Sequence, residues 1–173
     1  MSNPSQDPAE TSELRPRGPT IGHVHLKVAN LERSLAFYCG VLGFRVTQRL
    51  NERVVLISMG GDYHHHIALN TRESLGGSPP DRSSTGLEHF AILYPTRGQL
   101  ADAVRQVSEQ GITFRRAADY GISESIHVDD PDGIGVELSW DRPAQLWPRT
   151  AAGELNAGMR GLDVERLLQS NID

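Results

Sequence analysis

Short runs of alternating apolar and polar residues, broken by glycine and proline, follow the same order in both halves of the chain. In the first half the pattern predicts a strand, a helix and three more strands, over residues 21–28, 31–40, 44–50, 54–59 and 63–70. In the second half it predicts the same five elements, over residues 87–94, 96–109, 112–116, 123–128 and 135–140. The sequence therefore predicts an α+β protein built from two tandem βαβββ modules.

The segments outside these modules differ from them in composition. Residues 71–86 are rich in glycine, proline and serine and carry neither a helical nor a strand period, which is typical of a linker. Residues 1–19 hold four prolines among polar residues, and we expect them to be disordered. The expected organisation is a single domain over 20–143, with module one (20–70), the linker and module two (87–143), and then a tail over 144–173 with a short helix near 162–168.

The repetition gives equivalent positions to two histidines. His23 opens the first strand of module one, and His89 opens the first strand of module two. Because each sheet packs one face on its helix, two modules can line a shared cleft with equivalent positions. Glu137 lies inside an apolar strand, where an ionised carboxylate needs a compensating charge. The three residues are candidate metal ligands, and the alternative is that the histidines are structural and the glutamate lies on an edge strand.

Composition and charge limit the kinds of molecule that the protein is expected to bind. The 173 residues are 38% hydrophobic and 23% charged, with a formal net charge of -5 and no basic patch, which argues against binding to nucleic acid or to lipid. No apolar run approaches the roughly 18 residues that cross a bilayer, and the N-terminal segment lacks the apolar core of a signal peptide, so a cytoplasmic location is expected. The single cysteine, Cys39, lies on an apolar helix and is expected to be a small core residue.

Several runs of residues resemble the vicinal oxygen chelate superfamily of glyoxalases, bleomycin-resistance proteins and extradiol dioxygenases. The resemblance covers about residues 21–143 and is carried by the runs His23 to Tyr38, Val41 to Phe44 and Asp130 to Leu138. Two further runs, Leu87 to Arg97 and Val136 to Pro143, resemble the catechol 2,3-dioxygenase-like branch. The resemblance implies a cleft-shaped open β-barrel made from the two modules.

The resemblance also implies a metal site. It implies His23, His89 and Glu137 as a two-histidine, one-carboxylate triad, which on Fe(II) leaves adjacent positions for a catecholate and O₂. Glyoxalase I adds a fourth protein ligand, and the position that aligns with it here is Ala68. Alanine cannot bind a metal, which favours the open triad. Zn, Ni and Mn remain alternatives to iron.

A run of three histidines lies in the last predicted strand of module one, over residues 63–70. Since a strand alternates faces, either His65 or the pair His64 and His66 would point into the cleft. By resemblance to extradiol enzymes, His65, with His66 second, is the candidate for proton transfer near bound oxygen. The alternative is that these are ordinary strand histidines or an adventitious metal-binding run. His25 and Asn70 are expected to line the substrate pocket.

One pair of residues departs from the pattern of the branch that the chain resembles. Tyr120 stands where a histidine is expected, and His127 stands where a tyrosine is expected, ten positions before Glu137. If both side chains reach the cleft, they can still provide a donor and a base with their positions reversed. If they do not meet, the two residues give no support to the cleavage of a simple catechol.

Three functions are consistent with these residues. The first is an Fe(II)-dependent ring-cleavage dioxygenase that acts on a catechol-type aromatic and O₂. The second is a glyoxalase-, epimerase- or thiol-transferase-type metalloenzyme of the same fold, and the third is a protein that sequesters an aromatic ligand or antibiotic without turnover. A homodimer is expected in each case.

Overall fold

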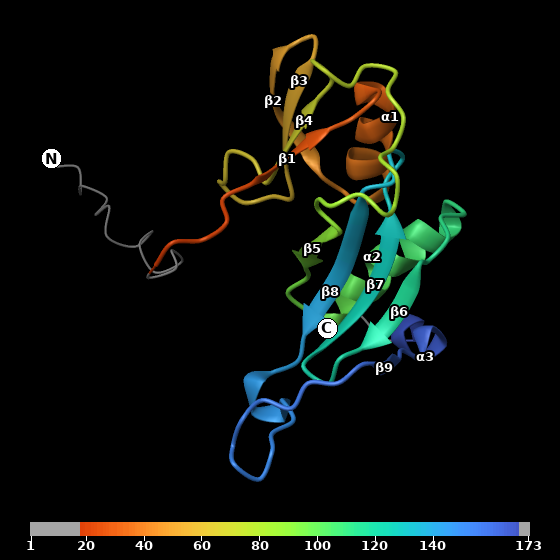
Figure 1. Ribbon diagram of the computed structural model, residues 1–173. Helices are drawn as coiled ribbons and strands as arrows, with labels where there is room; N and C mark the ends of the chain where they lie inside the picture. Colours follow the sequence, from red (N-terminus) through yellow and green to blue (C-terminus); the bar gives the residue numbers. More distant parts are fainter. Residues whose placement is uncertain (1–17, 170–173) are drawn as a thin grey trace, which may run out of the picture.

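The computed structural model describes residues 18–169, which form two β-sheets that share one hydrophobic core (Figure 1). The first sheet has the strand order β1-β4-β3-β2, with β1 and β4 parallel and the other neighbours antiparallel. Helix α1 (Leu31–Leu35) continues directly into the π-helix η2 (Ala36–Val41). The strands of this sheet are β1 (Val24–Lys27), β2 (Arg45–Asn51), β3 (Val54–Ser58) and β4 (Ile67–Asn70).

The second sheet repeats the order of the first and adds one strand. Its order is β5-β8-β7-β6-β9, so its first four strands correspond to β1-β4-β3-β2. Helix α2 (Arg97–Glu109) begins after Thr96, whose hydroxyl accepts the N–H of Gln99. The remaining elements are β5 (His89–Leu93), β6 (Arg116–Asp119), β7 (Ser123–Asp129), β8 (Gly135–Asp141), η3 (Ala144–Leu146), β9 (Arg160–Gly161) and α3 (Val164–Leu168).

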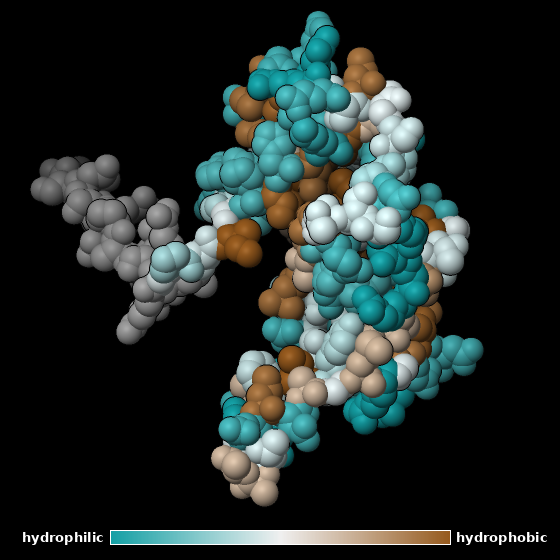
Figure 2. All heavy atoms as spheres, viewed as in Figure 1, coloured by the Kyte–Doolittle hydropathy of each residue, from teal (hydrophilic) through white to brown (hydrophobic). Residues whose placement is uncertain are grey.

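The predicted α+β class and the repeated βαβββ order are both confirmed. The two sheets remain open and form no closed barrel within residues 18–169. Figure 1 shows the first sheet and α1 at one end of the molecule and the second sheet with α2 and α3 at the other. On the face seen in Figure 2, hydrophilic residues cover most of the first module, with apolar residues showing between them.

Two predicted strands are wrong in their positions. The strand expected over 112–116 is shifted, since β6 begins only at Arg116. Ile112 and Phe114 alternate because they pack against the hydrophobic core from a segment outside the sheet. The strand expected over 63–70 begins only at Ile67. Gly60 and Gly61 have φ values of 124° and 63°, which turn the chain just before this point. The three histidines at 64–66 therefore precede β4, and strand alternation does not decide where they point.

The turn after β7 adds polar contacts between the modules to those of the shared hydrophobic core. The backbone N–H of Ala29 donates to Asp132 Oδ1 at 3.2 Å, and the guanidinium of Arg33 is ion-paired with the same carboxylate. Asp132 is 6% exposed, whereas the side chain of Arg33 is 49% exposed, so the carboxylate is buried and the guanidinium covers it from the solvent side. These bonds hold the start of α1 against the second module.

Two further expectations concern the N-terminal segment and the C-terminal tail. Residues 1–17 and 170–173 lie outside the described residues, so the disorder expected for 1–19 stays a prediction for most of its length. The helix expected near 162–168 corresponds to α3, and β9 is an element that the sequence pattern did not predict. Among residues 18–169, no helix is long and apolar enough to cross a membrane.

Candidate metal centre

The face of the second sheet that points away from α2 carries a row of polar side chains. Because side chains alternate along a strand, residues paired across neighbouring strands lie on one face. Arg116 pairs with His127, and His127 pairs with Glu137, so three neighbouring strands place these residues side by side. The neighbours of His127 along β7, Ile126 and Val128, are fully buried in the core. The row therefore lies on the open face of the second sheet.

Three potential metal ligands meet on this open face. His89 Nε2 lies 3.0 Å from Glu137 Oε2, and His127 Nε2 lies 3.9 Å from Glu137 Oε1. Each of the three residues offers a ligand atom within 4.8 Å of the other two, and theirs is the only such group found among the described residues. The rings of His89 and His127 meet edge to face, with centroids 5.1 Å apart.

The site is graded from buried to exposed. The side chain of His127 is 4% exposed, that of Glu137 13% and that of His89 32%. His127 Nε2 is buried and has no hydrogen-bond partner within the described part of the chain. A buried nitrogen without a partner carries a free-energy cost that a bound cation would remove. The burial gradient leaves His89 as the side of the group open to solvent.

Glu88 fixes the orientation of His89. Its carboxylate is ion-paired with His89 Nδ1, which leaves Nε2 directed at Glu137. The other carboxylate oxygen of Glu88 accepts a hydrogen bond from Arg115 at 2.9 Å, and Arg115 also bonds Asp129. A carboxylate on the second ring nitrogen is the common partner of a metal-binding histidine. Glu88 was not among the residues predicted from the sequence, although its position next to His89 is a signal that points to it.

Gly135 makes room for His89. The two residues are paired between β5 and β8, and a Cβ at position 135 would lie 2.8 Å from the Cβ of His89 and would collide with the backbone oxygen of Glu88. Real side chains do not approach this closely, so only glycine allows His89 and Glu88 to keep their positions. The close approach of β5 and β8 at this point therefore depends on Gly135.

Burial keeps His127 neutral. The pKa of His127 is lowered mainly by burial, and the positive charge of Arg116 lowers it further, while Glu137 acts in the opposite direction. A neutral imidazole can donate its lone pair to a metal, whereas an imidazolium cannot. With Glu137 as an oxygen ligand, the group has the two-histidine, one-carboxylate chemistry that suits Fe(II) and related divalent ions. The residues present fit a divalent metal.

The structure places His23, the first ligand implied by the resemblance, in a different environment. His23 lies just before β1, and its ring packs against that of His65 with centroids 4.4 Å apart. It is not a member of the group formed by His89, His127 and Glu137. The structure therefore brings together two of the three ligands implied by the resemblance and adds His127 to them.

The proton-transfer candidates form a cluster of rings beside β4. The rings of His64 and His65 have centroids 4.5 Å apart, and Tyr63 lies against both His64 and His66. Burial and the neighbouring imidazoles lower the pKa of His65. Burial, followed by the charge of His64, lowers the pKa of His66, whose Nδ1 accepts the N–H of Met59. His65 and His66 thus favour the neutral form that accepts a proton.

The other predicted residues of module one lie on or beside the first sheet. His25 is exposed and pairs with Ala68, which is buried. Asn70 ends β4, and its side-chain oxygen accepts the N–H of Arg72 at 2.7 Å. This bond lies in the turn after β4, and the expected place of His25 and Asn70 in a substrate pocket stays a prediction.

Tyr120 and His127 lie at opposite ends of the β6–β7 hairpin. The N–H of Tyr120 donates to Ser123 at the turn, whereas His127 lies opposite Arg116. The two positions are four residues apart along each strand, which corresponds to about 13 Å at the rise of an extended strand. Arg116, and not Tyr120, lies opposite His127 on β6, and no sequence pattern singled it out. Tyr120 and His127 therefore do not form a donor-and-base pair in the structure, which counts against a simple catechol as the substrate.

Two βαβββ modules with a histidine, histidine and carboxylate group on an open sheet face define the vicinal oxygen chelate class of proteins. The chain belongs to the Glyoxalase/Bleomycin resistance protein/Dioxygenase superfamily, whose family model matches residues 20–138.

Two relatives share more than 30% of their aligned residues with the chain. One is a catechol-2,3-dioxygenase of Bacillus subtilis (strain 168), 37% identical over 150 residues, which are 86% of this chain and 51% of the relative. The other is biphenyl-2,3-diol 1,2-dioxygenase 3 of Rhodococcus globerulus, 33% identical over 125 residues, which are 71% of this chain and 64% of the relative. The chain thus spans between half and two thirds of the length of these relatives.

Solved structures share the fold at lower identity. A glyoxylase/bleomycin resistance protein/dioxygenase domain from Frankia sp. EAN1pec has a TM-score of 0.60 at 19% identity, covering 73% of this chain and 94% of that one. A glyoxalase/dioxygenase from Nostoc punctiforme has a TM-score of 0.59 at 19% identity, covering 83% of this chain and all of the other. These similarities support the fold of the chain.

Proposed function

We propose that the chain is an extradiol-type dioxygenase that binds Fe(II) and cleaves a catechol-type aromatic ring with O₂. The observation that carries this proposal is the approach of His89, His127 and Glu137 on the open face of the second sheet. The names of the two relatives, a catechol and a biphenyl-diol dioxygenase, support the same reaction class. Bound Fe(II) would supply a Lewis acid that binds both vicinal oxygens of the substrate and also O₂.

In this proposal His89 and Glu137 are two of the three metal ligands. His127 is the third ligand that the geometry supports, since its Nε2 is buried without a partner and lies 3.9 Å from Glu137. His23 is the third ligand that the family resemblance implies, and it would have to reach the group from module one. The two assignments make opposite predictions for single substitutions, so they can be separated.

The chain's own residues hold the ligands and exclude water. Glu88 keeps Nδ1 of His89 engaged, so the lone pair on Nε2 stays available. The nearly complete burial of His127 keeps water from one side of the group. His65 is the proposed proton carrier, because its pKa is lowered and it can accept a proton from a substrate hydroxyl near neutral pH. This role requires the open faces of both modules to line one site.

The test is an assay of the Fe(II)-loaded protein with a panel of catechols in air, measuring oxygen uptake and ring-opened product. We expect both signals, and we expect His89→Ala and Glu137→Ala to abolish them together with metal binding. Arg53→Gln is the control, because Arg53 is exposed in the β2–β3 turn, away from the site. Absence of both signals in protein that has bound iron would overturn the proposal.

A metal titration of His127→Ala and His23→Ala separates the two ligand assignments. If His127 is the third ligand, only His127→Ala weakens metal binding strongly. If His23→Ala has that effect and His127→Ala does not, the ligand set implied by the resemblance holds. Metal analysis of protein purified without oxygen then tests iron against zinc, nickel and manganese.

A further inference from the structure

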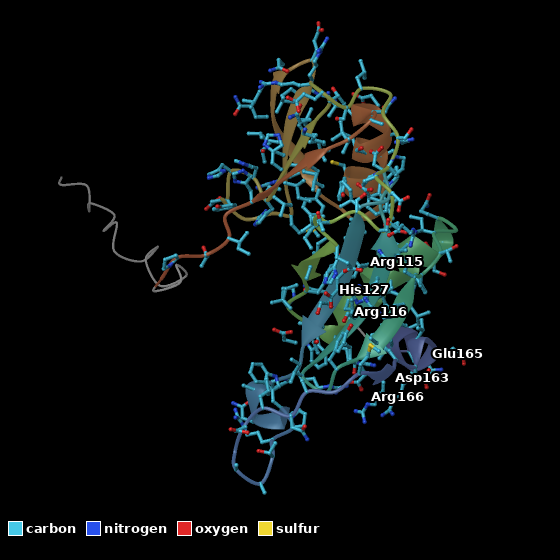
Figure 3. The ribbon with its side chains drawn as sticks, in the orientation of Figure 1. Arg115, Arg116, His127, Asp163, Glu165 and Arg166 are labelled. Carbon is cyan, nitrogen blue, oxygen red and sulfur yellow. The ribbon has the colours of Figure 1, made fainter. Side chains whose placement is uncertain are left out.

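Arg116 lies beside the candidate metal centre, at the end of the row on the open face. It pairs with His127 across β6 and β7, and His127 pairs with Glu137 across β7 and β8. Neighbouring strands are about 4.8 Å apart, so two strand spacings separate the backbone of Arg116 from that of Glu137. Figure 3 shows Arg116 and His127 close together on the second sheet. The guanidinium of Arg116 is thus within reach of a molecule bound at the metal centre.

The charge of Arg116 is not neutralised by the described part of the protein. The side chain of Arg116 is exposed and has no hydrogen bond or ion pair with any residue in the range 18–169. Its neighbour Arg115 differs, since it bonds both Glu88 and Asp129 at 2.9 Å. Arg115 therefore helps to hold Glu88, the partner of His89, in place. The guanidinium of Arg116 is available to bind a ligand.

The residues next to Arg116 on the same face of the sheet are small. The next row along the same strands is Ala118, Ser125 and Ser139, all of which have small side chains. The hydroxyl of Ser125 is buried and has no partner among the described residues. Ala118, Ser125 and Ser139 are 1%, 0% and 6% exposed, so these positions are covered, and a bound molecule would lie along the row itself, next to the exposed Arg116. The row therefore combines a group of potential metal ligands with a guanidinium that has no side-chain partner within residues 18–169.

We propose that Arg116 selects an anionic substrate, a catechol that carries a carboxylate substituent, by pairing with that carboxylate while the two hydroxyls bind the metal. A guanidinium and a carboxylate form two parallel charge-assisted hydrogen bonds, which fix the orientation of the ring as well as its position. This inference rests on the proposed function, since the diol must be held at the metal centre. Arg116 would be a specificity-determining residue that touches the substrate.

The test compares neutral and anionic diols with the same protein. The probes are catechol, 2,3-dihydroxybenzoate and 3,4-dihydroxybenzoate, and their binding is measured by calorimetry on protein loaded with Zn²⁺, which binds the same ligand types without oxygen chemistry. We expect at least one dihydroxybenzoate to bind about tenfold or more tightly than catechol at low salt. The advantage should shrink as the salt concentration rises, because salt screens an exposed charge pair.

The substitution Arg116→Gln removes the charge and keeps a polar side chain of similar length. It should abolish the advantage of the dihydroxybenzoate and leave the affinity for catechol within about twofold. Arg53→Gln removes an exposed arginine of module one and should leave both affinities unchanged. An unchanged thermal midpoint for Arg116→Gln, which alters an exposed side chain, checks that the fold is intact.

The possible outcomes separate the two proposals. If catechol binds but neither dihydroxybenzoate binds more tightly, or if Arg116→Gln keeps the preference, this inference is overturned and the proposed function stands. If no diol binds to the metal-loaded protein, the proposed function fails and this inference fails with it.

Discussion

The hydroxyl of Tyr38 donates a hydrogen bond of 2.9 Å to Asp130 Oδ2, which joins the π-helix of the first module to the turn after β7 of the second. The other oxygen of Asp130 accepts the backbone N–H groups of Asp132 and Ile134, both at 2.8 Å. Both carboxylate oxygens are thus engaged in a buried site. Because this turn precedes β8, the bond also connects the first module to the strand that carries Glu137.

Tyr38→Phe should destabilise the protein by about 1–3 kcal/mol at pH 7. Burial raises the pKa of Asp130, and the hydrogen bonds from Ile134, Tyr38 and Asp132 oppose that rise. A carboxyl with a raised pKa stabilises the fold below its unfolded pKa, near 3.9, and loses that contribution as the pH rises through its folded pKa. Without the Tyr38 hydroxyl, the ionised carboxylate of Asp130 loses a hydrogen bond and becomes less stable in the folded protein. The decrease in the free energy of unfolding caused by Tyr38→Phe should therefore be larger at pH 7 than near pH 4.

Urea unfolding at both pH values measures this difference. Tyr94→Phe is the matched control, because the hydroxyl of Tyr94 is also buried but has no partner among residues 18–169. Removing an unpaired buried hydroxyl should leave the free energy of unfolding unchanged or raise it. Equal losses for the two variants would contradict the assignment of a stabilising role to the Tyr38–Asp130 bond.

Gly135→Ala should weaken metal binding. The added Cβ would collide with the backbone of Glu88 and press on His89, so His89 must move away from Glu137. We expect at least a tenfold loss of metal affinity and a destabilisation of about 1–3 kcal/mol from overpacking. Metal titration and thermal unfolding check both. Gly158→Ala, where a Cβ meets nothing within 4 Å, should have neither effect.

Glu88→Gln should lower metal affinity without unfolding the protein. The neutral amide no longer stabilises the proton on Nδ1 of His89, and partners of this kind contribute about 10- to 100-fold to metal affinity. The measurement is a competition titration with a chromophoric chelator. Glu109→Gln, at the exposed end of α2, is the control. A Glu88→Gln variant with unchanged affinity would show that Glu88 does not support the site.

Asp119→Asn should weaken the contact between β6 and β9, because Arg160 of β9 is ion-paired with Asp119. It should also reduce the dependence of the free energy of unfolding on pH at acidic pH. Burial tends to raise the pKa of Asp119, but the N–H of Gly121 and the charges of Arg160 and Arg142 outweigh it, so the pKa is lowered. A lowered pKa contributes stability above the unfolded value, near 3.9, which is lost as the pH falls through the folded pKa.

The loss for Asp119→Asn should therefore be about 1–3 kcal/mol at pH 7 and should shrink below about pH 3. Urea unfolding across this range tests the trend. Asp141→Asn changes an exposed carboxylate at the end of β8 and should leave the pH dependence as it is. A constant difference between wild type and Asp119→Asn at all pH values would contradict the ionic explanation.

The periodicity of the sequence predicted most of the fold, because the two modules use local rules. Alternation and capping residues such as Thr96 define strands and helices within a few residues, and both modules follow them. The failures occurred where tertiary contacts replaced these rules. Ile112 and Phe114 alternate because they pack on the core, and the turn at Gly60 and Gly61 removes the histidines that follow from β4.

The candidate site was predicted in part, for a related reason. His89 and Glu137 lie on neighbouring strands of one module, so their approach follows from the βαβββ order. The position of Arg116 opposite His127 depends on the register of β6 against β7, which the strand predicted over 112–116 did not give correctly. The partnership of Glu88 with His89 and Arg115 depends on side-chain contacts, which periodicity does not describe.

The sequence by itself determined the two-module α+β fold and the chemistry of the side chains that could bind a metal. It did so because strand and helix periods, turn residues and ligand-type side chains are properties of single segments. The tertiary structure decided that His127 joins His89 and Glu137, that His23 lies against His65, and that Arg116 ends the row beside them. These relationships depend on strand register and on how the modules pack, and both are set by contacts between residues far apart in the chain.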